Sequence, residues 1–92
     1  MSIHELIERS LKQALVPERL IVLDESADHA GHAGHRAGGE SHFRVRIVSQ
    51  AFAGRSRVER HRLVNDTLKP AFAQGVHALA IEASAPGEPV RW

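Results

Sequence analysis

The stretch DESADHAGHAGHRAGGESHF, residues 24–43, carries four of the seven histidines of this chain. Three of them, His29, His32 and His35, recur at every third position among glycines and alanines. The apolar run LIVL precedes the stretch, and an alternating apolar and polar pattern follows it. We therefore predict two strands joined by a long connection, residues 26–41. Imidazoles on a loop that a rigid scaffold holds are typical of metal or cofactor sites.

Capping patterns predict a helix on each side of this hairpin. An S-x-x-E capping box begins at Ser2 and another begins at Ser56. Pro17 ends the first helix, and Pro70 weakens or ends the second near Lys69. The first helix carries an apolar stripe made of Ile3, Leu6, Ile7, Leu11 and Leu15. The second helix lines one face with Val58, His61, Val64 and Leu68.

The remaining elements complete a small α+β domain. The second strand spans residues 42–49, and a third follows Gly75 over residues 76–81. The tail, residues 85–92, holds too much proline and glycine for a firm helix. The order helix, strand, strand, helix, strand predicts a three-stranded sheet with the helices on one face. The length of 92 residues leaves room for one domain, residues 1–92.

Composition excludes several classes of function. A net charge of +1 predicts neither a nucleic-acid binder nor a membrane binder, and the absence of cysteine excludes disulfides and a thiol nucleophile. The amino-terminal stretch interleaves charges with apolar residues, so we do not expect a signal peptide. No apolar run approaches the ~20 residues that cross a bilayer, and we expect a cytoplasmic protein. No constellation of nucleophile, base and acid is visible, so we expect a non-enzyme.

Four motifs in this order resemble the BolA family. They are D-E-S-x-x-H at residues 24–29, E-S-H-F at 40–43, F-x-G followed by R-H-R within 52–62, and V-H-A-L-A-I at 76–81. The resemblance implies a KH-like fold of the class II type. It also implies a monothiol glutaredoxin as partner, with which BolA proteins share a [2Fe-2S] cluster in iron–sulfur trafficking and iron regulation. Some members of the family are described as DNA-binding transcriptional regulators.

The resemblance also implies which residues act as ligands. His77 in V-H-A-L matches the family's carboxy-terminal ligand histidine, and the second ligand is a His or Cys in the connection between the first two strands. Counting forward from D-E-S places that ligand at His29. Counting back from E-S-H-F places it nearer His32 and His35, because this connection is several residues longer than the common form. His29 is our first choice among the three.

The missing cysteines shape this hypothesis. Two histidines can replace two cysteines on one iron of a [2Fe-2S] cluster. A chain without cysteine can therefore supply only a histidine share, and the thiolates must come from a partner's cysteine, with glutathione as a further source. Two simpler interpretations stay open: the histidine repeat is a solvated loop, or it takes up Zn, Cu or Ni adventitiously. Without the resemblance, His77 reads as a strand-start histidine that the backbone satisfies.

The other histidines receive structural predictions. We expect His61 to be packed and hydrogen-bonded on the apolar face of its helix, His42 to lie at the surface on the basic face of its strand, and His4 to be solvated.

In solution we expect a monomer or a weak homodimer.

An arginine patch supports an alternative function. Its members at the start of the second helix are Arg55, Arg57, Arg60 and Arg62, and Arg44 and Arg46 lie on the second strand. Such a patch could contact the phosphates of double-stranded DNA, receive the carboxylates of glutathione or an acidic partner, or remain a solvated cationic face. The chain lacks the GXXG loop of nucleic-acid-binding KH domains, which argues against single-strand binding of that kind.

Overall fold

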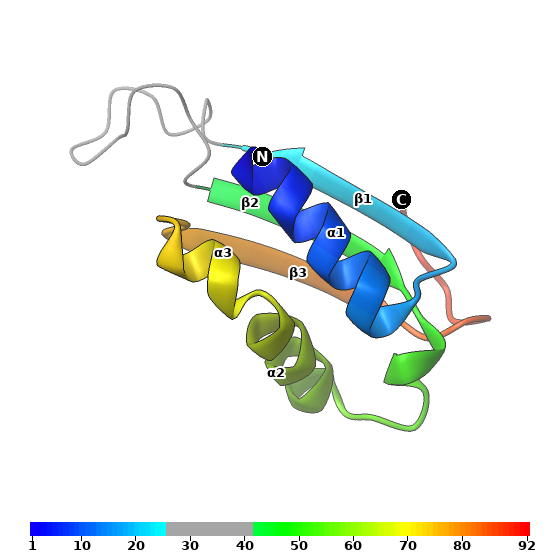
Figure 1. Ribbon diagram of the computed structural model, residues 1–92. Helices are drawn as coiled ribbons and strands as arrows, with labels where there is room; N and C mark the ends of the chain where they lie inside the picture. Colours follow the sequence, from blue (N-terminus) through cyan, green and yellow to red (C-terminus); the bar gives the residue numbers. More distant parts are fainter. Residues whose placement is uncertain (26–41) are drawn as a thin grey trace.

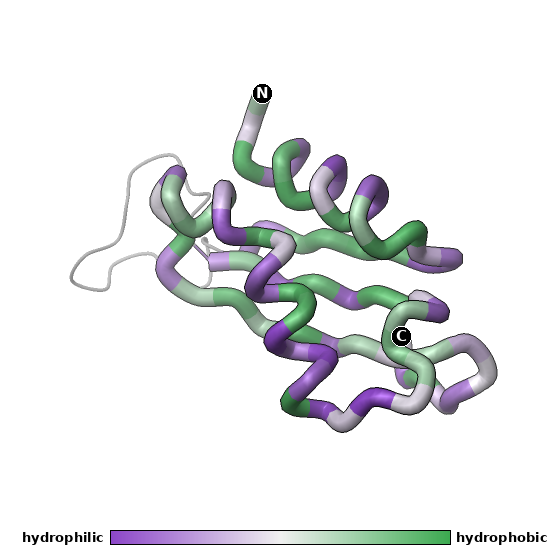
Figure 2. Tube along the Cα trace, turned by 60° about the horizontal axis from the view of Figure 1, so that its bottom comes forward, coloured by the Kyte–Doolittle hydropathy of each residue, from purple (hydrophilic) through white to green (hydrophobic). Residues whose placement is uncertain are grey.

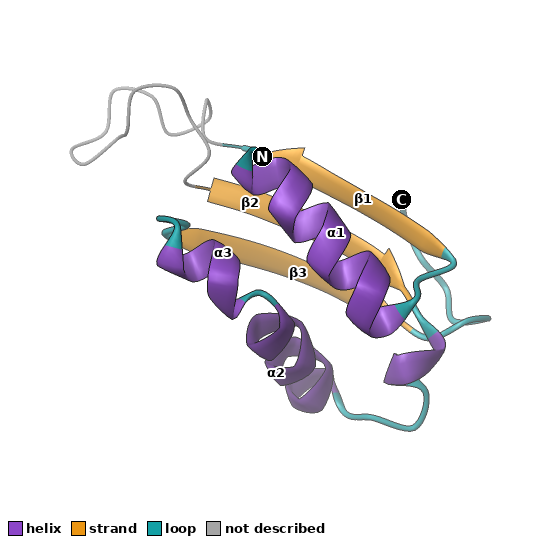
Figure 3. Cartoon of the chain, in the orientation of Figure 1, coloured by secondary structure: helices purple, strands orange, loops and turns teal. Residues whose placement is uncertain are grey.

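The computed structural model describes residues 1–25 and 42–92. Helices lie against one face of a three-stranded sheet whose order is β1-β2-β3 (Figures 1 and 3). The strands are β1 (Arg19–Asp24), β2 (His42–Val48) and β3 (Ala78–Ser84). The helices are α1 (Ile3–Leu15), the 3-10 turn η2 (Gln50–Phe52), α2 (Arg57–Thr67) and α3 (Lys69–Ala73). The α+β architecture and the element order predicted from the sequence are confirmed.

The sheet is mixed. β1 and β2 pair antiparallel, with Val22 opposite Val45, and β2 and β3 pair parallel, with Val45 opposite Ile81. A parallel pair needs a crossover, and α2 and α3 supply it. Because β2 and β3 run in the same direction, both strands begin at the same end of the sheet, where β1 ends. This arrangement positions the candidate site.

The core lies between the helices and the inner face of the sheet. Fully buried side chains come from α1 (Ile7, Leu11), β2 (Phe43, Val45, Ile47), η2 (Phe52) and α2 (Val64). In Figure 2 the hydrophobic parts of the tube follow the strands and the side of α1 that faces them. The inward positions of β2 alternate as its sequence predicts, since successive side chains of a strand point to opposite faces.

Two predicted boundaries and one predicted burial need correction. β3 begins at Ala78 and continues to Ser84, so His77 precedes the strand. α2 ends at Thr67, and Pro70 lies in the first turn of α3, where a missing N–H costs nothing. Val58, which we expected on the apolar face of the second helix, is 58% exposed.

A buried serine ties α1 to the end of β2. The Ser49 hydroxyl donates to the carbonyl oxygen of Leu15 and accepts from the N–H of Ala51. Val16, which follows α1, adopts a left-handed conformation with φ 43°, and Pro17 prevents the helix from continuing. The hydroxyl therefore satisfies a carbonyl that the end of the helix would otherwise leave buried. Within the two described ranges, no helix is long and apolar enough to cross a membrane.

Candidate metal centre

Two histidines meet where β2 and β3 begin. His42 opens β2, and the parallel register places it opposite Ala78, the residue after His77. The ring centroids of His42 and His77 lie 6.3 Å apart, with 31° between the ring planes. His77 is exposed and His42 is half-buried, so a partner can reach the imidazoles from solvent.

The backbone fixes this end of the sheet. Gly75, with φ 117°, turns the chain from α3 toward β3, a conformation that residues with a side chain rarely adopt. The N–H of Glu25, just after β1, donates to the carbonyl oxygen of His42 over 2.8 Å. Glu25 and His42 are also the residues that flank the histidine repeat. The two described residues that flank the repeat therefore lie at the same end of the sheet as His77.

The three repeat histidines, His29, His32 and His35, lie outside the described residues, and the choice among them stays a prediction. Within the described part, no group of three or more His, Asp or Glu side chains could hold a metal ion. Residues 1–25 and 42–92 thus provide a pair of imidazoles and no thiolate. This donor set fits the histidine share of a [2Fe-2S] cluster and not a complete cluster site.

The sequence reasoning missed His42 as a member of this site. We predicted a surface position on a basic strand face, but the residue is half-buried beside His77. The signal was present in the sequence: His42 and His77 each stand at the beginning of a strand. Only the parallel register of β2 and β3 shows that these two beginnings are neighbours.

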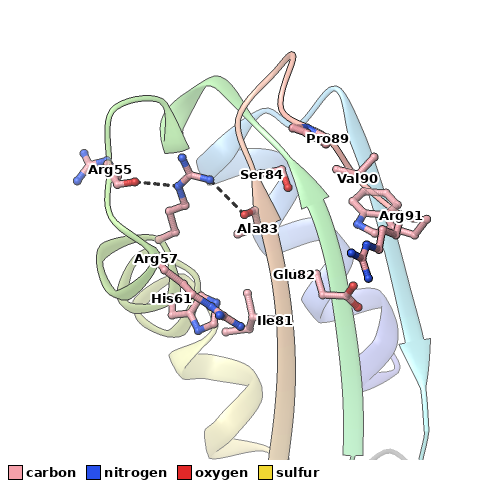
Figure 4. Close-up of a pocket in the computed structure, with 12 residues that line it drawn as sticks. Arg55, Arg57, His61, Ile81, Glu82, Ala83, Ser84, Pro89, Val90 and Arg91 are labelled. Atoms are coloured by element: carbon pink, nitrogen blue, oxygen red, sulfur yellow. Dashed lines mark hydrogen bonds between the residues drawn. The ribbon is translucent and has the colours of Figure 1, made fainter.

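The prediction for His4 was incomplete, because its side chain is 38% exposed but also makes two contacts. Its Nε2 lies 2.8 Å from the carbonyl oxygen of Val22, and its Nδ1 lies 2.9 Å from Oε1 of Glu8. His4 therefore connects α1 to β1 instead of facing solvent alone. His61 is half-buried and extends from α2 toward Ile81 of β3, where both residues line a groove (Figure 4). The structure brings neither residue to the His42–His77 pair.

The outer face of the sheet is less basic than predicted. Arg44 Nε lies 3.0 Å from Glu25 and its Nη1 lies 3.1 Å from Glu82, and Arg46 Nε lies 3.0 Å from the same Glu82 oxygen. The hydrogen bond from Arg46, together with that from Arg44, lowers the pKa of the Glu82 carboxyl. Two carboxylates thus balance two arginines, and the strand part of the predicted arginine patch is neutralised.

The four arginines of the patch at the start of α2 differ in whether another group of the protein pairs with them. Arg60 forms a bidentate pair with Glu88 at 2.6 and 2.8 Å, and its Nη1 also donates to the carbonyl oxygen of Ala83. That pairing lowers the pKa of Glu88 to about 2. Arg55 donates through Nε to the Ala51 carbonyl. Arg57 and Arg62 are exposed, and neither forms an ion pair with another described residue.

The fold is a small α+β domain with a parallel crossover between β2 and β3. Two histidines lie together where these strands begin. The family model described as BolA-like protein matches residues 11–88. The chain therefore belongs to the BolA family, which confirms the resemblance seen in the four motifs.

Relatives extend over the whole chain. The chain is 60% identical over 93 residues to the "Uncharacterized protein in cobS 5'region" of Sinorhizobium sp, covering 100% of both. It is 47% identical over 79 residues to the DNA-binding transcriptional regulator BolA of Vibrio cholerae, covering 86% of this chain and 71% of that protein. The solved BolA domain of SufE1 from Arabidopsis thaliana superimposes with a TM-score of 0.85 and 45% identity, covering 97% of this chain and 98% of that one. Curated relatives from Arabidopsis and from mammals are longer, and the chain spans 23–58% of their length.

Proposed function

We propose that this protein is a non-catalytic adaptor that shares a [2Fe-2S] cluster with a monothiol glutaredoxin, in iron–sulfur trafficking or iron regulation. The observation that carries the proposal is the imidazole pair at the sheet end, with His77 exposed and His42 beside it. His77 is the first ligand, and a histidine of the repeat, His29 before His32 and His35, is the second.

The ligand chemistry supports a shared cluster. This chain contributes neutral imidazoles only, and the chain has no cysteine at all. The partner must then supply thiolates, from its own cysteine and from glutathione. Imidazole binds metal only when it is neutral, so the complex should weaken as the pH falls through the range in which histidines become protonated.

His42 has a supporting role in this proposal. Its ring lies within contact range of His77 but opens a strand whose backbone is fixed by pairing on both sides. It can therefore orient the His77 ring or replace a repeat histidine as the second ligand. Residues that orient a metal ligand typically change metal affinity by about 10–100-fold when mutated, whereas loss of a ligand should abolish the site.

Native mass spectrometry of the protein mixed with a cluster-loaded monothiol glutaredoxin tests the proposal. We expect a heterocomplex that retains two irons and two sulfides. His77→Ala should remove the cluster-bearing heterocomplex, while His61→Ala, on α2 and away from the sheet end, serves as the matched control. A cluster-bearing heterocomplex that survives His77→Ala would refute the ligand assignment.

A second candidate function is binding to double-stranded DNA. Two observations favour it: the name of the Vibrio cholerae relative, and the exposed side chains of Arg57 and Arg62 on α2. Arginines without a carboxylate partner can neutralise phosphates and release counterions. Arg60 is a weaker candidate, because Glu88 already pairs with it.

A duplex-binding titration at several salt concentrations tests this second function. Each phosphate contact that is lost should reduce the slope of log K against log salt by about 1. Arg57→Ala and Arg62→Ala should each have that effect, and Arg44→Ala, whose charge is balanced within the sheet, should not. If neither Arg57→Ala nor Arg62→Ala changes duplex binding, α2 is not the contact surface.

A further inference from the structure

A groove of about 740 Å³ runs along β3 at the opposite end of the sheet from the two histidines. On the α2 side of β3 it is lined by Arg55, which precedes α2, and by Arg57 and His61 of α2 (Figure 4). On the other side of β3, toward β2 and β1, it is lined by the tail residues Pro89, Val90 and Arg91. The strand segment between these two sides spans residues 81–84. Among the strands that the structure describes, β3 is the last of the sheet, so one of its edges faces no other described strand.

The groove passes around that free edge. Arg44 and Arg46 reach Glu82 on the outer face of the sheet, so Ile81 and Ala83 point to the helical face. The groove is lined by Glu82 as well as by Ile81 and Ala83. Since it touches residues of both faces, it must include the edge between them.

The backbone of the edge is available for pairing. The N–H and C=O of one strand residue point to the same side and alternate along the strand. The carbonyl oxygen of Ser84 accepts from the N–H of Ser49, so the backbone polar groups of Ser84 point toward β2. By alternation, the backbone polar groups of Ala83 and Ile81 point toward the free edge. The Arg60 side chain donates a hydrogen bond to the carbonyl oxygen of Ala83. Within the described residues, no side chain makes such a hydrogen bond to the backbone of Ile81. An added strand could therefore exchange both hydrogen bonds with Ile81.

The charges around the groove favour an acidic segment as the added strand. Arg55, Arg57 and Arg91 are exposed, and none of them forms an ion pair with a residue of the described part. The carboxylates nearby are already engaged, Glu82 by Arg46 and Arg44 and Glu88 by Arg60. Glu59 accepts from the N–H of Ser56 and also interacts with the charge of Arg55, which leaves Arg57 as the freest arginine beside β3. Carboxylates of a segment added beside β3 would meet the guanidinium groups of Arg55 and Arg57, which lie on that side of the strand (Figure 4).

We propose that the free edge of β3 is a docking site for an extended acidic segment of a partner protein, which adds a fourth strand beside Ile81. Strand addition of this kind takes affinity from main-chain hydrogen bonds and specificity from the flanking side chains. A peptide offers alternating donors and acceptors to the edge, whereas a nucleic-acid backbone offers only acceptors. This site is separate from the histidine pair and does not depend on the proposed function.

Binding of the fluorescent hexapeptide Val-Glu-Val-Glu-Val-Glu, followed by anisotropy, tests the proposal. One N-methyl group on a central valine of the peptide should weaken binding about fivefold, because it removes one backbone hydrogen bond. Arg57→Glu should weaken binding about tenfold, while Arg62→Glu, an exposed arginine that does not line the groove, should change it less than about twofold. In amide NMR spectra, the Ile81 and Ala83 signals should shift on binding.

Four results would overturn the proposal. The first three are that the peptide does not bind, that the N-methylated peptide binds as tightly as the unmodified one, and that the Ile81 and Ala83 amide signals do not shift. In the fourth, a single-stranded oligonucleotide of equal charge binds more tightly than the peptide, which would make the groove a nucleic-acid surface. The unmodified protein is used with both peptides, so a folding defect cannot imitate the N-methyl effect.

Discussion

His42 and His77 lie side by side at one end of the sheet, with their ring centroids 6.3 Å apart, although 34 residues separate them in the chain. The parallel pairing of β2 and β3 creates this proximity, because it brings the starts of both strands together. Glu25 and His42, the described residues that flank the histidine repeat, are hydrogen-bonded to each other at this end. Among the described residues, the sheet thus brings two of the histidines together at one end.

The first prediction separates a ligand from an orienting neighbour. His77→Ala should abolish cluster sharing, whereas His42→Ala should weaken it about 10–100-fold if His42 orients the ring. Visible circular dichroism during titration of a cluster-loaded glutaredoxin measures both. If His42→Ala abolishes the signal as completely as His77→Ala, His42 is itself a ligand. If His42→Ala has no effect, the contact has no role in the complex.

The second prediction concerns His4, which joins α1 to β1. His4→Ala removes the contacts of the ring with the Val22 carbonyl and with Glu8. We expect a loss of about 1 kcal/mol in the free energy of unfolding, the usual contribution of one hydrogen bond. Urea unfolding measures the change. An unaltered midpoint would show that the ring contributes nothing to stability.

The third prediction uses the capping box of α2. The Ser56 hydroxyl accepts from the N–H of Glu59, and the Glu59 carboxylate accepts from the N–H of Ser56. The hydrogen bond to the Ser56 backbone lowers the pKa of Glu59. Ser56→Ala should cost 0.5–2 kcal/mol, roughly the range for a lost N-cap. Ser56→Asp should restore most of the loss, and failure to do so would argue against capping as the cause.

The fourth prediction is a dependence of stability on pH. The hydrogen bond from Arg60 lowers the pKa of Glu88 from 4.5 to about 2. A lowered carboxyl pKa stabilises the folded state above the unfolded value and loses that contribution as the pH falls toward the folded value. Stability from this pair should therefore be complete above pH 4.5 and decline between 4.5 and about 2.

Urea unfolding of Glu88→Gln across that pH range provides the check. The variant should be less stable than the parent at neutral pH, and the difference should shrink as the solution becomes more acidic. Glu18→Gln, on an exposed residue between α1 and β1, is a suitable control. A difference between parent and Glu88→Gln that stays constant down to pH 2 would contradict the role of the pair.

Much of the fold was predictable, because its signals are local. The stripe of α1, the alternation in β2 and the capping box at Ser56 each depend on residues a few positions apart, and the structure agrees with them. The boundaries of β3 were harder. Its residues Ala78 to Ser84 are small or half-buried, and their strand conformation depends on pairing with β2.

The site was predictable only in part, because its geometry is not local. The family motif pointed to His77, but the position of His42 beside it follows from register. In the same way, the pairing of Arg44 and Arg46 with Glu82 joins two strands that lie far apart in the sequence. A count of arginines along the chain therefore overestimated the positive charge of the outer face.

Pulsed electron paramagnetic resonance on the reduced heterocomplex tests the central claim most directly. The chain is labelled with ¹⁵N-histidine and mixed with an unlabelled glutaredoxin that carries the [2Fe-2S] cluster. We predict hyperfine coupling to ¹⁵N from this chain, which His77→Ala removes and His61→Ala leaves intact. Absence of ¹⁵N coupling in the parent complex, or coupling that persists unchanged in His77→Ala, would contradict the account.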